Sequence, residues 1–573
     1  MPDKSLICLF LVVLLLPSTL AAELTVTGIE GELERNVRAF ATIASESCDA
    51  EAWLVRRRFR ALDSEARKAL EPFGYYEPTI TTSLSRDEDC WSATLAIDPG
   101  EPVLLRRVDI RIDGAAGSDP SFQALIDVSA LAQGKVLRHA DYERFKKSLQ
   151  IRAADRGYFE ATYTQSQLDV WPEAGVADIT LHFTSGPRYR ISEIRQEQGF
   201  VDPAIVTAYL DLEVGAYYNS EDLARAYRDL SDSAYFGQIE VSPDLATAAE
   251  GQVPVRVILQ PGTRIEYTIG VGASTDFGPR FRSGFRNNRI NRKGHRLIAD
   301  LGVAEEIQGL AIEYRVPLRD PRREWFSVTG GYLNEEIDTF ENETERVGIR
   351  WSKAMSDTWL RTLSVDANRE SFEIGEDIDT TRSIVPAINF DHKRSDRDIF
   401  PHYGRRLGFE VRGTDEAIGS SLSYVQATFW MRWIRSFGQR NRLLARLNAG
   451  VTASGDFSQL PPSVRFFAGG DESVRGFDYD TLGPTDAEGN VVGGNNLLVA
   501  SLEYERHLTG NFYGALFVDA GNAFDDTDFT AEVGAGIGIK WRSPLGPLRL
   551  YLGYPVSDDE ESLRVHLRLG ADL

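Results

Sequence analysis

The chain has 573 residues, which is too long for one ordinary domain, and it carries 86 acidic against 63 basic residues, a formal net charge of −23. A nucleic-acid partner needs a basic face, so this charge balance disfavours one. Beyond residue 22 no run is long and apolar enough for a membrane-spanning helix, although the alternating strands of a membrane β-barrel would leave no such run.

The first 22 residues have the pattern of an export signal. Lys4 is followed by an apolar run from Leu6 to Leu16, and then by the small residues Ala21 and Ala22. The run is too short to cross a bilayer, so we expect cleavage near Ala22 and a signal peptide over residues 1–22.

Export would leave two cysteines, Cys48 and Cys90, within one small predicted domain. An oxidising compartment favours a disulfide between them, and two unpaired thiols are the alternative. The seven histidines are scattered without ligand spacing, so neither a metal site nor another cofactor is expected.

An internal repeat runs through the part of the chain before Pro261. Residues 74–78, Gly-Tyr-Tyr-Glu-Pro, are echoed by Gly-Tyr-Phe-Glu-Ala at 157–161 and more weakly by Tyr-Phe-Gly at 235–237. Each echo follows an amphipathic helical pattern, at 51–70, 141–156 and 220–233, and precedes two strand-like runs. We therefore predict three units of the order strand, helix, helix, strand, strand, over residues 24–100, 101–187 and 188–262. The open edges of such small sheets can accept a strand from another chain.

The remainder, residues 263–573, reads as a succession of about sixteen strands, within the even-numbered range of bacterial membrane barrels. Examples are the runs 264–273, 295–303, 311–316, 326–331, 346–352, 405–411, 443–451, 496–504, 513–520, 533–541, 548–553 and 563–569. Many of them alternate apolar and polar residues, as lipid-facing and lumen-facing positions would. A soluble β-sandwich would alternate as well. The export signal and the strand count favour α+β repeats followed by an all-β, sixteen-stranded transmembrane barrel.

A long loop, about 452–494, interrupts these strands and is rich in glycine and aromatic residues. Loops of this length are usually functional or disordered, and this composition argues against disorder. Its segment Val474-Arg475-Gly476-Phe477 resembles the Val/Ile-Arg-Gly-Phe/Tyr hallmark of the Omp85 family. Further segments resemble family motifs: Phe-Val-Asp-Ala-Gly at 517–521, Gly-Gly at 493–494 with Ser-Leu-Glu at 501–503, and a Pro-x-x-Gly turn at 401–404.

The resemblance implies that the three repeats are periplasmic POTRA domains and that the barrel lies in the outer membrane with the loop folded into its lumen. Arg475 falls on the arginine of the hallmark, and an arginine inside a lumen needs carboxylate partners for its planar fork. Asp519 and Glu503 lie on strands just after the loop, so we hypothesise that both hold Arg475. A solvated surface arginine is the alternative. Gly476 would let the backbone turn sharply beside it.

The family resemblance also implies a lateral gate between the first and last barrel strands. Gly270 and Gly272 lie in the first strand, and Gly570 follows the last. Glycines weaken a strand, which is compatible with a weak seam, but they also fit beside bulky lumen residues.

Three POTRA-like units in a chain of this length resemble the TamA branch of the family. That resemblance implies an assembly or translocation factor for outer-membrane substrates such as autotransporters, docked through its POTRA domains to a TamB-like protein anchored in the inner membrane. A dedicated secretion pore of the two-partner type is the alternative, and a passive porin would leave the repeats unexplained. We find no Gly-x-Ser-x-Gly, His-Glu-x-x-His or Gly-x-x-x-x-Gly-Lys segment, so no enzymatic activity is expected.

Overall fold

The computed structural model describes residues 22–86, 90–397, 399–526, 528–543, 546–558 and 563–569, so nearly all of the expected signal peptide lies outside the described residues. The chain forms two compact units, whose boundary passes through the third repeat. One unit comprises the chain up to Ile194 with the short segments Glu213–Asp222 and Pro243–Val255, and the other comprises the rest.

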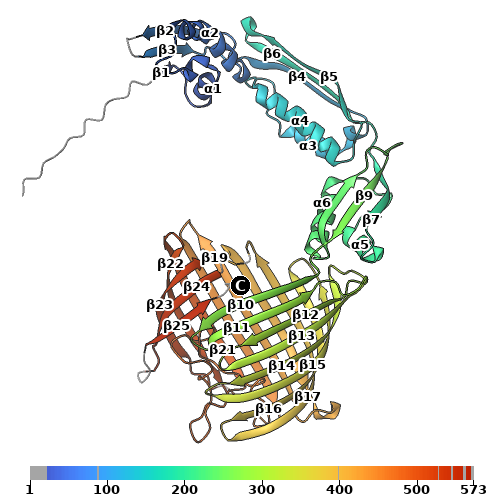
Figure 1. Ribbon diagram of the computed structural model, residues 1–573, viewed down its shortest axis with the longest axis vertical. Coiled ribbons are helices and arrows are strands. Elements are labelled where there is room, and N and C mark those ends of the chain that lie inside the picture. The colour runs from blue at the N-terminus through green and yellow to red at the C-terminus, as the bar shows by residue number, and fades with distance from the viewer. Residues whose placement is uncertain are drawn as a thin grey trace, which may run out of the picture. The chain divides into compact units, whose positions relative to one another are not determined.

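The first α+β module places two helices against a three-stranded sheet (Figure 1). Its elements are β1 (Glu23–Thr27), α1 (Glu32–Phe40), α2 (Ala52–Leu70), β2 (Thr79–Arg86) and β3 (Trp91–Asp98). The sheet order is β1-β3-β2, with β1 parallel to the central strand. Every second side chain of β3, beginning at Trp91, is buried, and these side chains join Val37, Val55 and Leu62 in the core. The period of two in β3 and the helical period in α2 thus bury one apolar face each.

A disulfide joins Cys48, which precedes α2, to Cys90, which immediately precedes β3, and closes a loop with a sequence separation of 42. The indole N–H of Trp91 donates to the carbonyl of Ser47 at 3.1 Å and ties the same two segments together. The bond therefore constrains the entrance to both the helix and the central strand of the module.

Replacing Cys48 and Cys90 together with serine is expected to destabilise the first module by about 2–4 kcal/mol, because the reduced chain regains the entropy of an open loop. Hydrogen exchange of β3 in the full chain should accelerate, and a reducing agent should do the same to the unaltered protein. Unchanged protection of β3 would show that packing and the Trp91 hydrogen bond suffice.

Two further modules within the described chain repeat this element order. The second has β4 (Leu104–Asp113), α3 (Pro120–Asp127), α4 (His139–Asp155), β5 (Thr162–Trp171) and β6 (Val176–Thr184), and the third has β7 (Arg190–Glu197), α5 (Pro203–Leu210), α6 (Ser220–Asp232), β8 (Phe236–Pro243) and β9 (Gln252–Pro261). Their sheet orders, β4-β6-β5 and β7-β9-β8, match that of the first module. Among the described residues, no helix has the length and apolar character needed to cross a membrane.

Sixteen antiparallel strands within the described residues close into a barrel, β10 to β25, each bonded to its neighbour in sequence. The strands are β10 (Ile265–Ser274), β11 (Gly278–Asn287), β12 (Arg296–Val303), β13 (Ile307–Pro317), β14 (Glu324–Glu336), β15 (Phe340–Ala354), β16 (Trp359–Ile374), β17 (Asp377–Ser395), β18 (Tyr403–Thr414), β19 (Tyr424–Phe437), β20 (Asn441–Ser454), β21 (Asn496–Thr509), β22 (Phe512–Phe524), β23 (Glu532–Ser543), β24 (Gly546–Pro555) and β25 (Arg564–Leu569). The predicted fold class, α+β repeats followed by a sixteen-stranded barrel, is confirmed.

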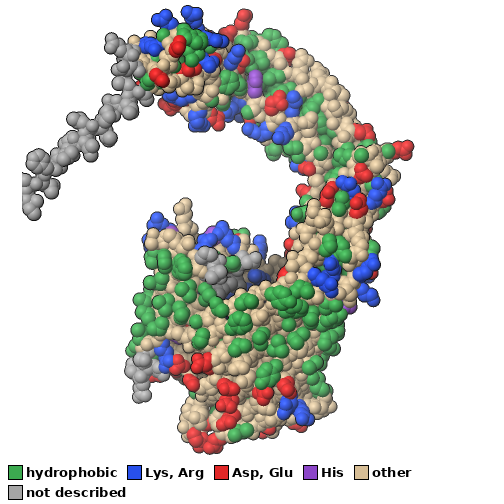
Figure 2. All heavy atoms as spheres, viewed as in Figure 1, with side chains coloured by type: hydrophobic (Ala, Val, Ile, Leu, Met, Phe, Trp, Pro, Cys, Tyr) green, Lys and Arg blue, Asp and Glu red, His purple; other side chains and the backbone are tan. Residues whose placement is uncertain are grey.

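The outer wall of the barrel is apolar, as a lipid-facing wall must be. β10 exposes Tyr267, Ile269 and Val271 at every second position. β23 exposes Ile539 and Trp541 and buries Lys540 between them. Figure 2 shows hydrophobic side chains spread over this wall, with acidic side chains gathered toward one end. The alternation of apolar and polar residues in these strands therefore belongs to a closed barrel and not to a soluble β-sandwich.

The twelve strand ranges named from the sequence leave out β11, β16, β17 and β19, and several of them are too short. The run predicted at 311–316 is β13, Ile307–Pro317, and the run predicted at 346–352 is β15, Phe340–Ala354. β15 begins with the acidic segment Phe-Glu-Asn-Glu-Thr-Glu at 340–345, and β13 begins with Ile-Gln-Gly-Leu at 307–310. In both strands the backbone ladder continues beyond the predicted run.

Candidate functional site

The loop between β20 and β21, residues 455–495, is an ordered element. Phe466 pairs with Gly494 and Ala468 with Leu482 in isolated bridges, which fold the loop back on itself. Val474 and Phe477 are buried and pack with Ala468 against Val499 of β21. The loop is thus fixed by its own apolar core against the barrel strands.

Gly476 takes a backbone conformation that favours glycine, with φ +106°. A Cβ atom there would lie 3.1 Å from the backbone of Tyr554 and Pro555 at the end of β24. The hallmark glycine therefore allows both the turn and the close approach of the loop to the wall.

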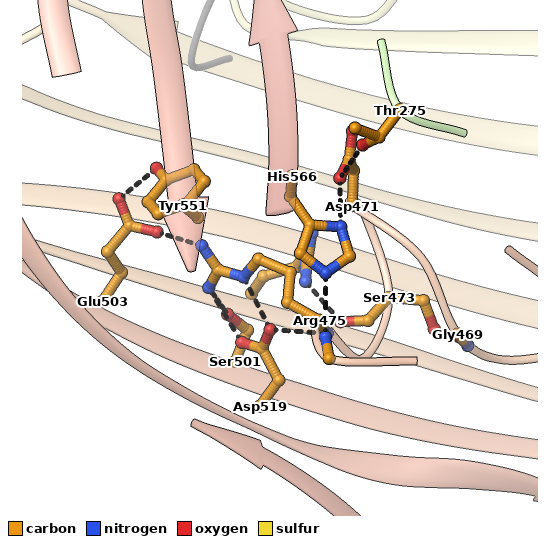
Figure 3. Close-up of polar contacts among 12 residues, drawn as sticks. Thr275, Gly469, Asp471, Ser473, Arg475, Ser501, Glu503, Asp519, Tyr551 and His566 are labelled. Atoms are coloured by element: carbon orange, nitrogen blue, oxygen red, sulfur yellow. Dashed lines mark hydrogen bonds and ion pairs between the residues drawn. The ribbon is translucent and has the colours of Figure 1, made fainter. Parts of the chain in front are cut away.

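Arg475 lies at the centre of a buried ionic cluster (Figure 3). Its Nε and Nη2 donate to the two oxygens of Asp519 at 2.7 and 2.9 Å, and its Nη1 donates to Glu503 at 2.6 Å. Its backbone N–H also donates to Asp519, at 3.1 Å. The three side chains are 4%, 0% and 6% exposed, so the loop is held by charge-assisted bonds largely shielded from water.

Two aromatic rings also pack against the guanidinium group of Arg475. Its central carbon lies 3.7 Å from the ring centroid of Phe517 and 4.7 Å from that of Tyr551. The Tyr551 hydroxyl donates to the second oxygen of Glu503 at 2.7 Å. Asp519 is on β22, Glu503 on β21 and Tyr551 on β24, so one arginine joins three strands. The structure brings together Arg475, Asp519 and Glu503, as the sequence predicted, and adds Tyr551 to the cluster.

His566 of β25 connects the loop to the last strand (Figure 3). Its Nε2 accepts the backbone N–H of Gly476 at 2.9 Å, which leaves the proton on Nδ1, 2.6 Å from an oxygen of Asp471. The backbone N–H of Asp471 donates to Asp276 at 2.9 Å, in the turn between β10 and β11. Asp471 therefore joins the last strand to the first hairpin through the loop.

The side chains of Asp276, Asp471 and His566 are of the types that bind metals, and one ligand atom of each lies within 4.8 Å of the others. Both imidazole nitrogens of His566 are already engaged by protein groups, so the cluster is a hydrogen-bonded bridge between segments. Sequence spacing could not reveal it, because Asp471 is 195 residues from Asp276 and 95 from His566.

The seam between β10 and β25 has a sparse backbone ladder. Within the described residues β10 pairs with β25 only at Ser274 and Arg568, whereas it pairs with β11 along its whole length, Ile265 to Ser274. Side chains supplement the seam: Arg280 donates to the carbonyl of Leu569 at 3.1 Å, and Glu472 of the loop forms an ion pair with Arg568. Among the described residues, side-chain and loop contacts thus supplement a short backbone ladder at the seam.

Two of the three glycines predicted for the gate lie in a described strand, where they face arginines. Gly270 and Gly272 of β10 stand opposite Arg282 and Arg280 of β11, and a Cβ on Gly272 would approach the Arg280 side chain to 3.0 Å. Gly272 thus leaves room for an arginine. Gly570 lies outside the described residues.

Asp276 should make the contact between the loop and the first hairpin sensitive to pH. Burial, and then the charge of Asp471, raise its pKa to about 6, so its ionised form is disfavoured in the folded site. A raised carboxyl pKa gives stability that is present at low pH and lost as pH rises through about 6. At pH above this value, Asp276→Asn should therefore protect the loop peptide around Asp471 against hydrogen exchange more than the native carboxylate does. Below it the two proteins should converge, and equal protection at every pH would contradict the assignment.

A second buried cluster joins β20, β21 and β23. Glu505 accepts from Arg442 at 2.5 Å and from Lys540 at 2.6 Å, and all three side chains are at most 3% exposed. Arg442 also donates to the carbonyl of Pro401 at 3.0 Å and stacks over the Phe400 ring at 3.9 Å. The turn motif noticed at 401–404 is thus anchored by residues that sequence reasoning missed. Alternation alone does not show which of many charged strand residues face one another.

Comparison with known proteins agrees with this architecture. A family model described as Omp85 superfamily domain matches residues 267–572, more than half of the chain, and one described as POTRA domain TamA domain 1 matches residues 23–99. The outer membrane protein assembly factor BamA of Neisseria meningitidis serogroup B is 22% identical, over 87% of this chain and 70% of its own length. The factor of the same name from Nitratidesulfovibrio vulgaris is 21% identical, over 72% of this chain and 54% of its own length.

Among solved structures, the crystal structure of BamA from Haemophilus ducreyi lacking POTRA domains 1-3 has the same fold. Its TM-score is 0.70 at 16% identity, and the match covers 82% of this chain and 99% of that one. The fold and the family match over the barrel together give the assignment: the chain belongs to the Omp85 superfamily of outer-membrane β-barrel proteins.

Proposed function

We propose that this protein is a TamA-like factor that assembles or translocates outer-membrane proteins, autotransporters among them. The observation that carries the proposal is the match of the first module to a POTRA domain of TamA type, at residues 23–99. The two following modules share its element order and sheet order, and on this ground we assign them as POTRA domains as well.

In this proposal the modules lie in the periplasm and dock a TamB-like protein anchored in the inner membrane. Each module has a three-stranded sheet with one outer strand, β2, β5 or β8, that pairs within the described residues only with the central strand of its sheet. An edge strand offers unpaired N–H and C=O groups, so an extended or β-rich partner can add a strand to it.

The barrel would act at the seam. Within the described residues β10 pairs with β25 at one residue pair, so separating the two strands should break few backbone hydrogen bonds. The freed edge of β10 can then pair with a strand of a substrate. The loop would keep the seam closed, because Asp471 contacts β25 through His566 and the first hairpin through Asp276. The Arg475 cluster would in turn hold the loop in place.

Photo-crosslinking from the exposed edge strand β2 in native envelopes tests the partner. Probes at Ser83 and Ser85, both exposed, should capture a large β-rich protein anchored in the inner membrane. A probe at Glu341 on the barrel serves as the control and should not capture it. Capture of a single secreted passenger in place of such a protein would instead support a dedicated secretion pore.

A disulfide across the seam tests the gate. Cysteines at Ser274 and Arg568, the registered pair, should block assembly of an autotransporter substrate when oxidised and restore it when reduced. Cysteines at Ser283 and Leu301, registered between β11 and β12, form the matched control and should leave assembly unchanged. Normal assembly with the seam locked would rule out lateral opening.

A further inference from the structure

The repeated aromatic turn has a structural role that the proposed function does not use. In the first two modules it begins at a glycine with positive φ, +94° at Gly74 and +81° at Gly157. In the third module Ala234, with φ +58°, takes the place of the glycine before Tyr235. The weak third echo is therefore the same turn, placed after the second helix of its module like the others.

The first turn is in contact with the second module. The carbonyl of Gly74 accepts the N–H of Val103 at 2.8 Å, just before β4. The Tyr76 hydroxyl lies 2.6 Å from Nε2 of His139, the first residue of α4. A Cβ on Gly74 would lie 2.6 Å from the carbonyl oxygen of Leu137. The glycine thus permits both the turn and the close approach of the next module.

The second turn makes equivalent contacts with the third module. The carbonyl of Gly157 accepts the N–H of Tyr189 at 2.9 Å, just before β7. The Phe159 ring packs edge-to-face on Tyr189 and Tyr218, at centroid distances of 5.3 and 4.9 Å. A Cβ on Gly157 would lie 2.9 Å from the Cβ of Tyr218.

The acceptor sites of the two turns are built alike. Val103 and Tyr189 each precede the first strand of their module, and Leu137 and Tyr218 each precede its second helix. The N–H of Leu137 donates to the carbonyl of Val103, and that of Tyr218 to the carbonyl of Tyr189, both at 2.9 Å. Each module therefore presents the same paired segment to the turn of the module before it.

The third turn is in contact with the barrel. The carbonyl of Tyr235 accepts the N–H of Gly262 at 2.9 Å, shortly before β10. The Tyr235 hydroxyl donates to the carbonyl of Gly294 at 2.6 Å, and the guanidinium of Arg296 lies 4.4 Å from its ring centroid. Arg296 also donates to the carbonyl of Ser233 at 2.5 Å. β10 thus follows this turn as β4 and β7 follow the other two.

We infer that this turn is a recurring joint, which fixes each module against the element that follows it in the chain. Three occurrences, with different side chains, place a backbone carbonyl and an aromatic residue of the turn on the next element. A turn that only ended a helix would need no such contacts. Gly175, at a turn between β5 and β6, shows the difference: its φ is also positive, +63°, but nothing lies within 4 Å of a Cβ added there.

Spin-label distance measurements on the full chain in nanodiscs test the joint. Labels on cysteines replacing Ser83 in β2 and Gln167 in β5, both exposed, report the relative motion of the first two modules. Gly74→Ala should broaden and shift the distance distribution, because the added methyl group strains the turn and collides with Leu137. Gly175→Ala, which strains a positive-φ turn without a collision, should leave the distribution unchanged.

Tyr76→Phe provides a milder variant, since it keeps the ring and removes the hydroxyl that contacts His139. It should broaden the distribution less than Gly74→Ala, and it carries the test if the latter fails to fold. An unchanged distance distribution in a folded Gly74→Ala protein would overturn the inference. If Gly74→Ala does not fold, an unchanged distribution in Tyr76→Phe would overturn it instead. So would equal broadening by Gly175→Ala, because strain alone would then account for the effect.

Discussion

Replacing Arg475 with alanine is expected to release the loop from the barrel wall at a cost of about 3–5 kcal/mol, the range for breaking a buried ion pair. The cost is high because Asp519 and Glu503 would remain buried beside the vacated site. Urea unfolding of the purified barrel, followed by its mobility in gel electrophoresis without heating, would measure the loss. Arg475→Lys keeps the charge but lacks the planar fork, so it should give an intermediate value.

A charge exchange tests direct pairing. Arg475→Asp and Asp519→Arg should each be destabilising alone, and their combination should recover part of the loss. Recovery should be incomplete because of Glu503, which accepts a hydrogen bond from Arg475 in the native protein. In the double variant Glu503 would lie beside the new carboxylate at position 475. No recovery at all in the double variant would argue against the Arg475–Asp519 pair as the source of the stability.

Replacing Glu505 with alanine should have an effect of similar size, about 3–5 kcal/mol, because it removes the carboxylate that lies between two buried cations. The loss should extend to the turn at Pro401, which Arg442 holds by a hydrogen bond to its carbonyl. Hydrogen exchange around residues 400–404 and urea unfolding would measure both effects.

The exposed strand pair Glu345–Arg369 provides the matched control. Its side chains are about half exposed, at 55% and 51%, and its partners also lie on adjacent strands. Glu345→Ala should therefore cost at most about 1 kcal/mol. Equal losses in the two variants would mean that burial does not determine the strength of these ion pairs.

Much of the fold could be predicted from the sequence because it follows from local periodicity. The period of two in β23 and the helical period in α2 are visible in the residues themselves. The strand ranges named from the sequence omit β11, β16, β17 and β19. Of these, β11 has arginine and glycine at many positions, and β16 and β17 end in charged segments with polar residues on both faces. Their pairing is determined by neighbouring strands, which no single run of sequence reveals.

The residues of the candidate site also fall into two groups, those that the sequence could predict and those that it could not. Arg475, Asp519 and Glu503 could be proposed because they lie in short motifs, and the charge of an arginine in a lumen demands acceptors. Tyr551, His566 and the Glu505 cluster could not, because each depends on contacts between strands far apart in the chain. His566 in particular reads as an ordinary residue of an alternating strand until the closure of the barrel brings β25 beside the loop.

The three turns also bear on how such a protein could change its length during evolution. Because β4, β7 and β10 each follow the same kind of turn, an additional module inserted by duplication would arrive with both a turn and an acceptor for one. Neither the barrel nor the existing modules would need new surfaces to receive it. The number of repeats could then vary among descendants while the membrane domain stayed unaltered.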